Sequence, residues 1–158
     1  MTAPWFSEKR NVELSTIQYL ETELQASWTG ITVVKSFTQA YDTGINPPIV
    51  SIYMTDTNNT RREVGSTALF SSYQIAIDIF AKSDGQRIDL SAFIVDKLKD
   101  GWVYYLYSHP SGSPQTLDRT ANGRVYVSSF DTDTPIRFGE TVDMKDKFRH
   151  SIIITVRK

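Results

Sequence analysis

The sequence predicts an α+β fold, in which a largely antiparallel β-sheet carries two amphipathic helices packed on one face, plus a long β-hairpin and a C-terminal extended arm. Two stretches place apolar residues at helical spacing, and the runs between and after them alternate apolar with polar residues. Most of these strand patterns are joined by hairpin connections, which favours antiparallel pairing. At 158 residues, residues 1–158 are interpreted as a single α+β domain, because this length is typical of one domain.

The two helices are expected over residues 11–29 and 86–99. Asn11 is predicted to cap the first helix, and Gly30 follows its end. Ser83 opens a capping box in front of the second helix. The apolar residues that should face the sheet are Ile17, Leu20, Leu24 and Trp28 in the first helix, and Leu90, Ile94, Val95 and Leu98 in the second.

The strand patterns are most regular in residues 69–81, where Tyr73, Ile75, Ile77 and Ile79 alternate with smaller or polar residues. This alternation describes a sheet with one buried face and one wetter face. The last pattern, over residues 148–157, should lie inside the sheet because chain ends fray unless a sheet holds them. The other expected strands cover residues 31–37, 49–54, 102–107 and 124–130.

Residues 55–67 are polar and lie between two strand patterns, so they are interpreted as the protruding tip of the long hairpin. The pair Asn58-Asn59 is predicted at its turn, because asparagine is common in turns. Arg61-Arg62 beside the turn form a basic spot in a nearly neutral chain. That spot is explained either by solubility and protection of the sheet edge or by contact with an acidic partner surface.

Residues 102–147 are interpreted as an aromatic run, a loop and an extended arm. Asn122-Gly123 is the usual signal for a hairpin turn, and residues 131–147 are interpreted as the arm. The aromatic run is unusual because one face of a strand can bury only half of it. Its rings are therefore expected either in the core or partly exposed at a subunit or partner interface. The candidate interface residues are Asn58, Asn59, Arg61, Arg62, Trp102, Tyr104, Tyr105 and Tyr107.

Composition excludes several classes of protein. The 17 basic and 18 acidic residues give a net charge of 17 − 18 = −1, which argues against a dedicated binder of nucleic acid or of anionic membranes. The chain has no cysteine, which rules out disulfides, thiolate zinc sites and cysteine nucleophiles. The N-terminus lacks the pattern of a signal peptide, and no apolar stretch is long enough to cross a bilayer.

Chemical motifs are scarce. Glycine-rich phosphate-binding patterns are absent, and the two histidines, His109 and His150, have no companions at metal-ligand spacing. One enzyme hypothesis remains, a metal-dependent nuclease that uses Asp133, Asp143 and Lys145, because two carboxylates and a lysine can hold a divalent ion and position a water. The main expectation is a protein that is not an enzyme and has no catalytic residues, cofactor or metal.

The order of these pieces resembles the tail terminators, small tail-completion proteins of long-tailed bacteriophages. The resemblance rests on the N-terminal helix VELSTIQYLETELQ, the block YQIAIDIFAKSDGQRIDLSAFIVDKLKDG and the terminal strand RHSIIITVRK. The block from residue 73 to residue 101 carries most of it. The length of residues 102–147 departs from the family pattern, and those residues are interpreted as an arm that could reach a neighbouring subunit.

The resemblance implies a structural virion protein that assembles in the host cytoplasm. Its copies would form a ring, commonly a hexamer, on the last ring of the tail tube. The ring would stop tail polymerisation and dock the head-completion proteins, while DNA passes through the lumen without specific binding. The nearest alternative is another head-tail connector or head-closure protein of the neck. A third alternative is a monomeric domain that binds a peptide or ligand with the aromatic run.

Overall fold

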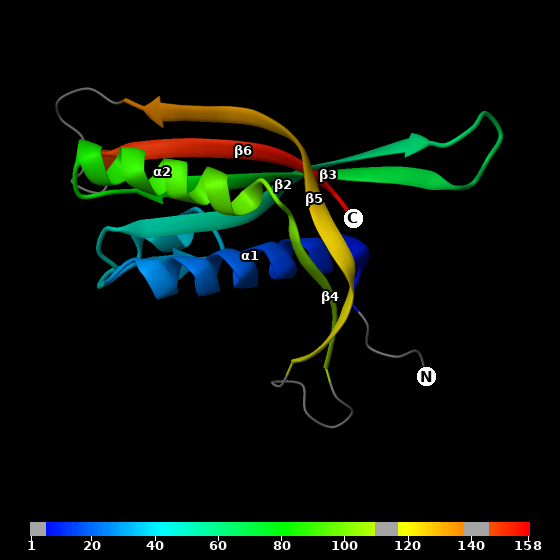
Figure 1. Cartoon of the computed structure of the whole chain (residues 1–158), viewed down its shortest axis with the longest axis horizontal. Coiled ribbons are helices and arrows are strands. Elements are labelled where there is room, and N and C mark those ends of the chain that lie inside the picture. The colour runs from blue at the N-terminus through cyan, green and yellow to red at the C-terminus, as the bar shows by residue number, and fades with distance from the viewer. Residues whose placement is uncertain (1–5, 110–116, 138–145) are drawn as a thin grey trace.

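The computed structural model describes residues 6–109, 117–137 and 146–158. These residues form two α-helices, a short 3₁₀ helix and one curled six-stranded sheet (Figure 1). The elements in chain order are α1 (Glu8–Ser27), β1 (Thr32–Val34), η1 (Thr38–Tyr41), β2 (Ile49–Arg61), β3 (Leu69–Phe80), α2 (Asp84–Leu98), β4 (Trp102–Ser108), β5 (Asp118–Ile136) and β6 (Arg149–Arg157).

The strand order is β1-β2-β3-β6-β5-β4, and every neighbouring pair is antiparallel except β1 with β2. The prediction of a largely antiparallel α+β fold is therefore confirmed. The final strand, β6, lies between β3 and β5, so the prediction that the end of the chain sits inside the sheet is also confirmed. The expected strand over residues 31–37 is shorter than predicted, since β1 ends at Val34 and the chain then turns before η1.

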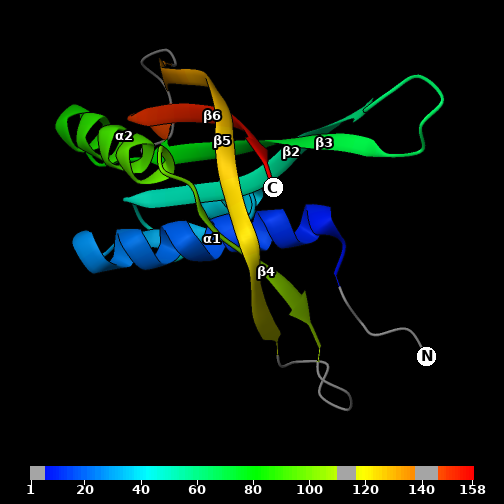
Figure 2. The ribbon, with the colours of Figure 1, turned by 45° about the vertical axis from the view of Figure 1, so that its right-hand side comes forward.

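Both helices pack on one face of the sheet and lie next to each other (Figures 1 and 2). Lys97 of α2 forms an ion pair with Glu23 of α1 at 3.4 Å, and the Tyr19 hydroxyl donates to the Lys97 carbonyl at 2.8 Å. The core between helices and sheet contains Leu20 and Leu24 from α1, Leu90 and Ile94 from α2, and Ile75, Ile77, Ile152 and Ile154 from the central strands.

The residues that cap the two helices test the predictions made from the sequence directly. Ser83 caps α2 and its side chain accepts from the Gln86 amide, which confirms the capping box. The prediction that Asn11 caps α1 is wrong, because Ser7 does so and α1 begins at Glu8. Asn11 instead lies one turn inside the helix and is completely buried.

The long hairpin of β2 and β3 projects beyond the helices (Figure 1). Asn58 and Asn59 do not form its turn, as the sequence predicted, but pair with Ser72 and Ser71 inside the ladder. The turn lies further on, between Arg61 and Leu69. Two adjacent asparagines therefore marked a polar, exposed stretch of strand rather than the reversal itself.

The Asn122-Gly123 signal is also wrong as a turn. Both residues lie within β5, which runs without a break from Asp118 to Ile136. The register opposite β4 shifts at this point, between the pairs Tyr105–Ala121 and Val103–Arg124, and Gly123 has φ +93°. A glycine with positive φ suits a β-bulge as well as it suits a hairpin turn, since both need a backbone conformation that side chains disfavour.

β5 belongs to two strand pairs and bends between them (Figure 2). Its first part pairs with β4 in a second projecting hairpin, and its second part pairs with β6. The expected C-terminal arm therefore starts inside the sheet, since residues 131–136 end β5. The rest of that arm falls mainly on residues 138–145, which lie outside the described residues. No helix in the described part of the chain is long and apolar enough to cross a membrane.

Candidate subunit interface

The aromatic run forms β4, and most of it is not available to a partner. The side chains of Trp102, Tyr104 and Tyr107 are only 1%, 1% and 4% exposed. The prediction that they are partly exposed at an interface is therefore wrong. The physical reason is the position of β4, which pairs with β5 while α1 packs across it.

Polar partners on α1 make this burial of aromatic residues possible. Trp102 donates its indole N–H to the Thr16 hydroxyl at 3.1 Å and stacks on Tyr19 with ring centroids 5.7 Å apart. The Tyr107 hydroxyl donates to Gln18 at 2.6 Å. Large aromatic side chains can be buried in a core when their N–H or O–H groups are hydrogen-bonded. Tyr105 is the half-buried ring of the run, and the Arg119 guanidinium lies over it at 4.3 Å.

The outer edge of β4 is closed by hydrogen bonds from α1. Asn11 accepts from the Tyr107 amide at 3.2 Å, and Ser15 accepts from the Tyr105 amide at 3.0 Å. The Phe6 amide donates to the Tyr107 carbonyl at 3.1 Å. An exposed strand edge invites pairing with another chain, and these bonds remove that opportunity along β4.

The same helix also caps β2 near its middle. Glu13 of α1 accepts from the Met54 amide at 2.9 Å, beyond the segment Ile49–Ser51 that pairs with β1. Past Met54, β2 continues into the projecting hairpin. Within the described residues, no strand pairs with this outer part of β2 on the side away from β3.

A second edge is open on the opposite side of the sheet. β4 pairs with β5 only as far as Val125. Beyond it, Tyr126–Ile136 pair with β6 on one side and with no described strand on the other. We name residues 55–62 the hairpin margin and residues 126–137 the β5 margin.

Exposed apolar side chains concentrate on the hairpin next to the hairpin margin and on the β5 margin. Five of the eight large apolar residues that are exposed in the described part of the chain lie on the hairpin or on the β5 margin. Such residues are unremarkable singly but mark interaction surfaces when they gather. They are Val64, Leu69 and Phe70 on the hairpin, and Tyr126 and Phe130 on the β5 margin.

The basic pair of the hairpin is held in place by local contacts. Arg61 donates to the Ser66 carbonyl at 2.8 Å across the turn, and the Arg62 guanidinium lies 4.5 Å from the Phe70 ring centroid. Asn58, Asn59, Arg61 and Arg62 are all exposed, so they remain the candidate interface residues of the hairpin. Their role as an interface stays a prediction.

The β5 margin carries two carboxylates, both exposed. Hydrogen bonds from the hydroxyls of Ser129 and Thr155 hold the pKa of Asp131 below its usual value. Asp133 contacts the ring Nε2 of His150, which is buried. The other ring nitrogen of His150 lies 2.9 Å from Arg87 Nη1 of α2. Arginine can only donate, so His150 accepts at Nδ1 and donates to Asp133 from Nε2.

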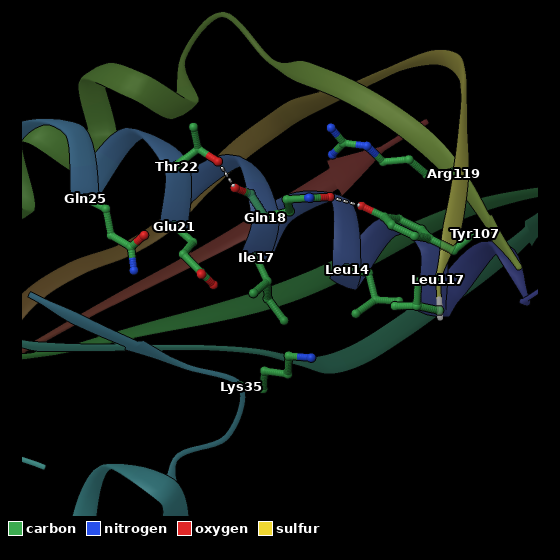
Figure 3. A pocket seen from close by; sticks show the side chains of 10 residues that line it. All are labelled: Leu14, Ile17, Gln18, Glu21, Thr22, Gln25, Lys35, Tyr107, Leu117 and Arg119. Carbon is green, nitrogen blue, oxygen red and sulfur yellow. Dashed lines mark hydrogen bonds between the residues drawn. The ribbon is translucent and has the colours of Figure 1, made fainter. Parts of the chain in front are cut away.

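A shallow groove of about 470 Å³ runs along the outer side of α1 (Figure 3). Gln18, Glu21 and Thr22 of α1 line it together with Lys35 and with Arg119 of the β4–β5 hairpin. Its lining mixes acids and bases with aliphatic side chains. Among the residues that line it, no nucleophile is hydrogen-bonded to a general base.

The nuclease hypothesis needs Asp133, Asp143 and Lys145 to converge. Asp133 is engaged by His150, while Asp143 and Lys145 lie outside the described residues. The described residues contain no group of three side chains that could hold a metal ion. This hypothesis therefore stays a prediction.

On the face of the sheet away from the helices, an ion pair joins β3 to β6. Asp78 lies 3.5 Å from the Arg149 guanidinium and accepts from the Tyr53 hydroxyl at 2.9 Å. Burial raises the pKa of Asp78, and the bonds from Tyr53 and Arg149 oppose that rise. Burial and the nearby Asp78 charge raise the pKa of Tyr53 to about 12. Each member has partners within the fold, so this cluster is structural.

No protein-family model matches the chain, and no curated protein matches it significantly. The candidate interface is therefore argued from its geometry alone.

Sequence reasoning missed the β5 margin. The alternation that normally identifies a half-buried strand is broken there by register shifts between Val127 and Ser129 and between Phe130 and Thr132. The signal that could have found it is Tyr126 and Phe130 in a stretch whose other residues are mostly polar.

Proposed function

We propose that this protein is a structural subunit that assembles into a ring, and that the ring is the tail terminator of a long-tailed bacteriophage. The observation that carries the proposal is the pair of open margins on opposite sides of one sheet, with exposed apolar side chains near the polar hairpin margin and on the β5 margin itself. A ring needs two different, complementary surfaces on every subunit, because its contacts are head-to-tail. A hexamer is the subunit number implied by the resemblance to terminators.

The rest of the molecule is consistent with assembly rather than catalysis. The grooves beside α1 are open to solvent, and Asp78, Tyr53 and Arg149 bond one another within the fold. With a net charge of −1, the subunit lacks the excess of positive charge that binds phosphates strongly. A ring of such subunits could surround DNA without gripping it.

In this role the ring binds the last ring of the tail tube protein and ends polymerisation. Its opposite face then presents a docking surface to the head-completion protein. The protein is thus a component of the virion, at the junction of tail and neck, and it acts through surfaces alone.

Deleting the gene from the phage that encodes it tests this role. We expect tail tubes of uncontrolled, excessive length that fail to join heads, and tubes of normal length when the protein is supplied in trans. Tails of normal length that merely fail to join heads would contradict the terminator role and assign the protein to the head side of the neck.

A further inference from the structure

We infer that the hairpin margin of one copy binds the β5 margin of the next copy, as an antiparallel extension of the sheet. This inference rests on the ring of the proposed function and assigns the surfaces that form it. The partner is a second copy of this chain, and the contact joins two different surfaces.

The direction of the two margins follows from the sheet. The strands β2, β3, β6 and β5 form a run of four in which every neighbouring pair is antiparallel. The first and last strands of such a run point in opposite directions. If rotation about a ring axis places the next copy beside the first, its β2 therefore runs antiparallel to β5.

The order of charges along the two margins favours the same direction. The hairpin margin has Asp56 first and then Arg61 and Arg62, whereas the β5 margin has Asp131 and Asp133 first and then Arg137. In antiparallel alignment the arginines of the hairpin meet the aspartates of β5, and Asp56 approaches Arg137. In parallel alignment like charges would meet, which is unfavourable. Topology and charge thus agree independently.

The faces of the strands also agree. Arg61 pairs with Leu69 and Arg62 follows it, so the two guanidinium groups start from opposite faces of the hairpin. On β5, Asp133 points to His150 on the helix side, and Asp131 bonds to Thr155 on the other side. One arginine and one aspartate are therefore available on each face. Arg61 opposite Asp133 places Arg62 opposite Thr132, next to Asp131.

Bulges keep this contact specific. The two register shifts in β5 and Pro135 near its end interrupt the row of hydrogen-bonding groups. These devices normally prevent uncontrolled pairing of strand edges. Only a short ladder of backbone hydrogen bonds can form here, so contacts between side chains determine which strand binds. Exposed Leu69 and Phe70 on the hairpin, and Tyr126 and Phe130 on β5, supply the apolar contact.

The two margins also lie at different heights along the strands. The hairpin margin pairs with the first half of β3, Leu69–Gln74. The β5 margin pairs with β6, and β6 pairs with the second half of β3, Tyr73–Phe80. Joining them displaces each copy along the strand direction relative to its neighbour. A stagger of this kind is what closing a sheet into a ring requires.

The absence of cysteine gives a clean cross-linking test. With Arg61 opposite Asp133, Thr60 falls opposite Thr134, and both are exposed. We expect a mixture of Thr60→Cys and Thr134→Cys proteins to form disulfide dimers under mild oxidation, and the double variant to form a ladder of covalent oligomers. Each single variant alone should remain uncross-linked. Thr22→Cys on α1, also exposed, replaces Thr134→Cys as the matched control and should not cross-link with Thr60→Cys.

A charge exchange tests the same contact without cysteine. Arg62→Asp and Asp131→Arg should each weaken self-association about fivefold or more, and the variant carrying both changes should recover it. Circular dichroism and melting temperature check that each variant is folded.

The outcomes separate this inference from the proposed function. Cross-linking of Thr60→Cys alone would show hairpin-to-hairpin contact and overturn the inference. An oligomer of about six times the 18.0 kDa subunit mass without mixed cross-links would also overturn it, while the terminator role would stand if the deletion produces overlong tails. Mixed cross-links combined with tails of normal length would support the contact and reject the terminator role.

Discussion

The β4 edge and the β5 margin belong to neighbouring strands of one sheet, but α1 covers the first, whereas no described element pairs with the second. Along β4, Asn11 and Ser15 of α1 accept from the backbone amides, and the aromatic side chains are buried. Along the β5 margin no described strand or helix pairs with the edge, and Tyr126 and Phe130 are exposed. The difference teaches that an aromatic run does not by itself predict exposed rings, because exposure depends on whether another element covers the strand.

The largest expected difference between the two kinds of region concerns aromatic truncation. Trp102→Ala should lower the free energy of unfolding by about 3–5 kcal/mol, because it leaves a cavity in the core and removes a partner of Thr16. Phe70→Ala, on the exposed hairpin, is the matched control and should change it by no more than about 0.5 kcal/mol. Urea denaturation measures both. Equal losses would mean that the hairpin is as much a part of the core as β4.

This comparison also shows what the sequence could predict. Helices and the central strands follow from local patterns, so the block from Tyr73 to Leu98 was predicted closely, with Ser83 as the N-cap of α2. The sequence left open whether Trp102 is buried or exposed, because its burial depends on α1 packing across β4 from a distant part of the chain. The prediction that Asn11 caps α1 was wrong for the same reason. An asparagine near a helix start is usually a cap, but Asn11 bonds to β4, which is distant in the sequence.

The candidate site was predicted only in part. The exposed arginines of the hairpin were found because two adjacent bases stand out in a polar stretch. The β5 margin was not found, because bulges hide its alternation and Asn122-Gly123 imitates a turn. Tertiary pairing, which decides whether a strand edge is covered, leaves no local signal in a single sequence.

A second, smaller effect on the free energy of unfolding is expected at the hydrogen bonds that cover the β4 edge. Asn11 bonds to the Phe6 carbonyl, the Tyr104 hydroxyl and the Tyr107 amide, and it is fully buried. Asn11→Ala should lower the free energy of unfolding by about 2 kcal/mol, since it leaves buried polar groups without partners.

The matched control for that change is Asn58→Ala on the exposed hairpin margin, which should be nearly neutral. Amide hydrogen exchange of Tyr107 sharpens the test, because this amide should exchange faster in Asn11→Ala and at the wild-type rate in Asn58→Ala. Unchanged exchange in both variants would show that Asn11 does not close the edge.

The smallest effect concerns Tyr73, whose hydroxyl donates to Glu8 in the first turn of α1 at 2.7 Å. Burial, together with this hydrogen bond, raises the pKa of Tyr73 to about 12 from the ordinary 10.0. The folded state therefore keeps the proton after the unfolded chain has begun to lose it. The stabilisation is complete below pH 10 and is lost as the pH rises toward 12.

Tyr73→Phe should lower the free energy of unfolding by about 1 kcal/mol at neutral pH. It should also make stability fall less steeply with pH in the alkaline range, as followed by urea denaturation at a series of pH values. Tyr126→Phe, on the β5 margin, is the control and should retain the wild-type slope. A wild-type slope in Tyr73→Phe as well would show that the contact between α1 and β3 is not made through this proton.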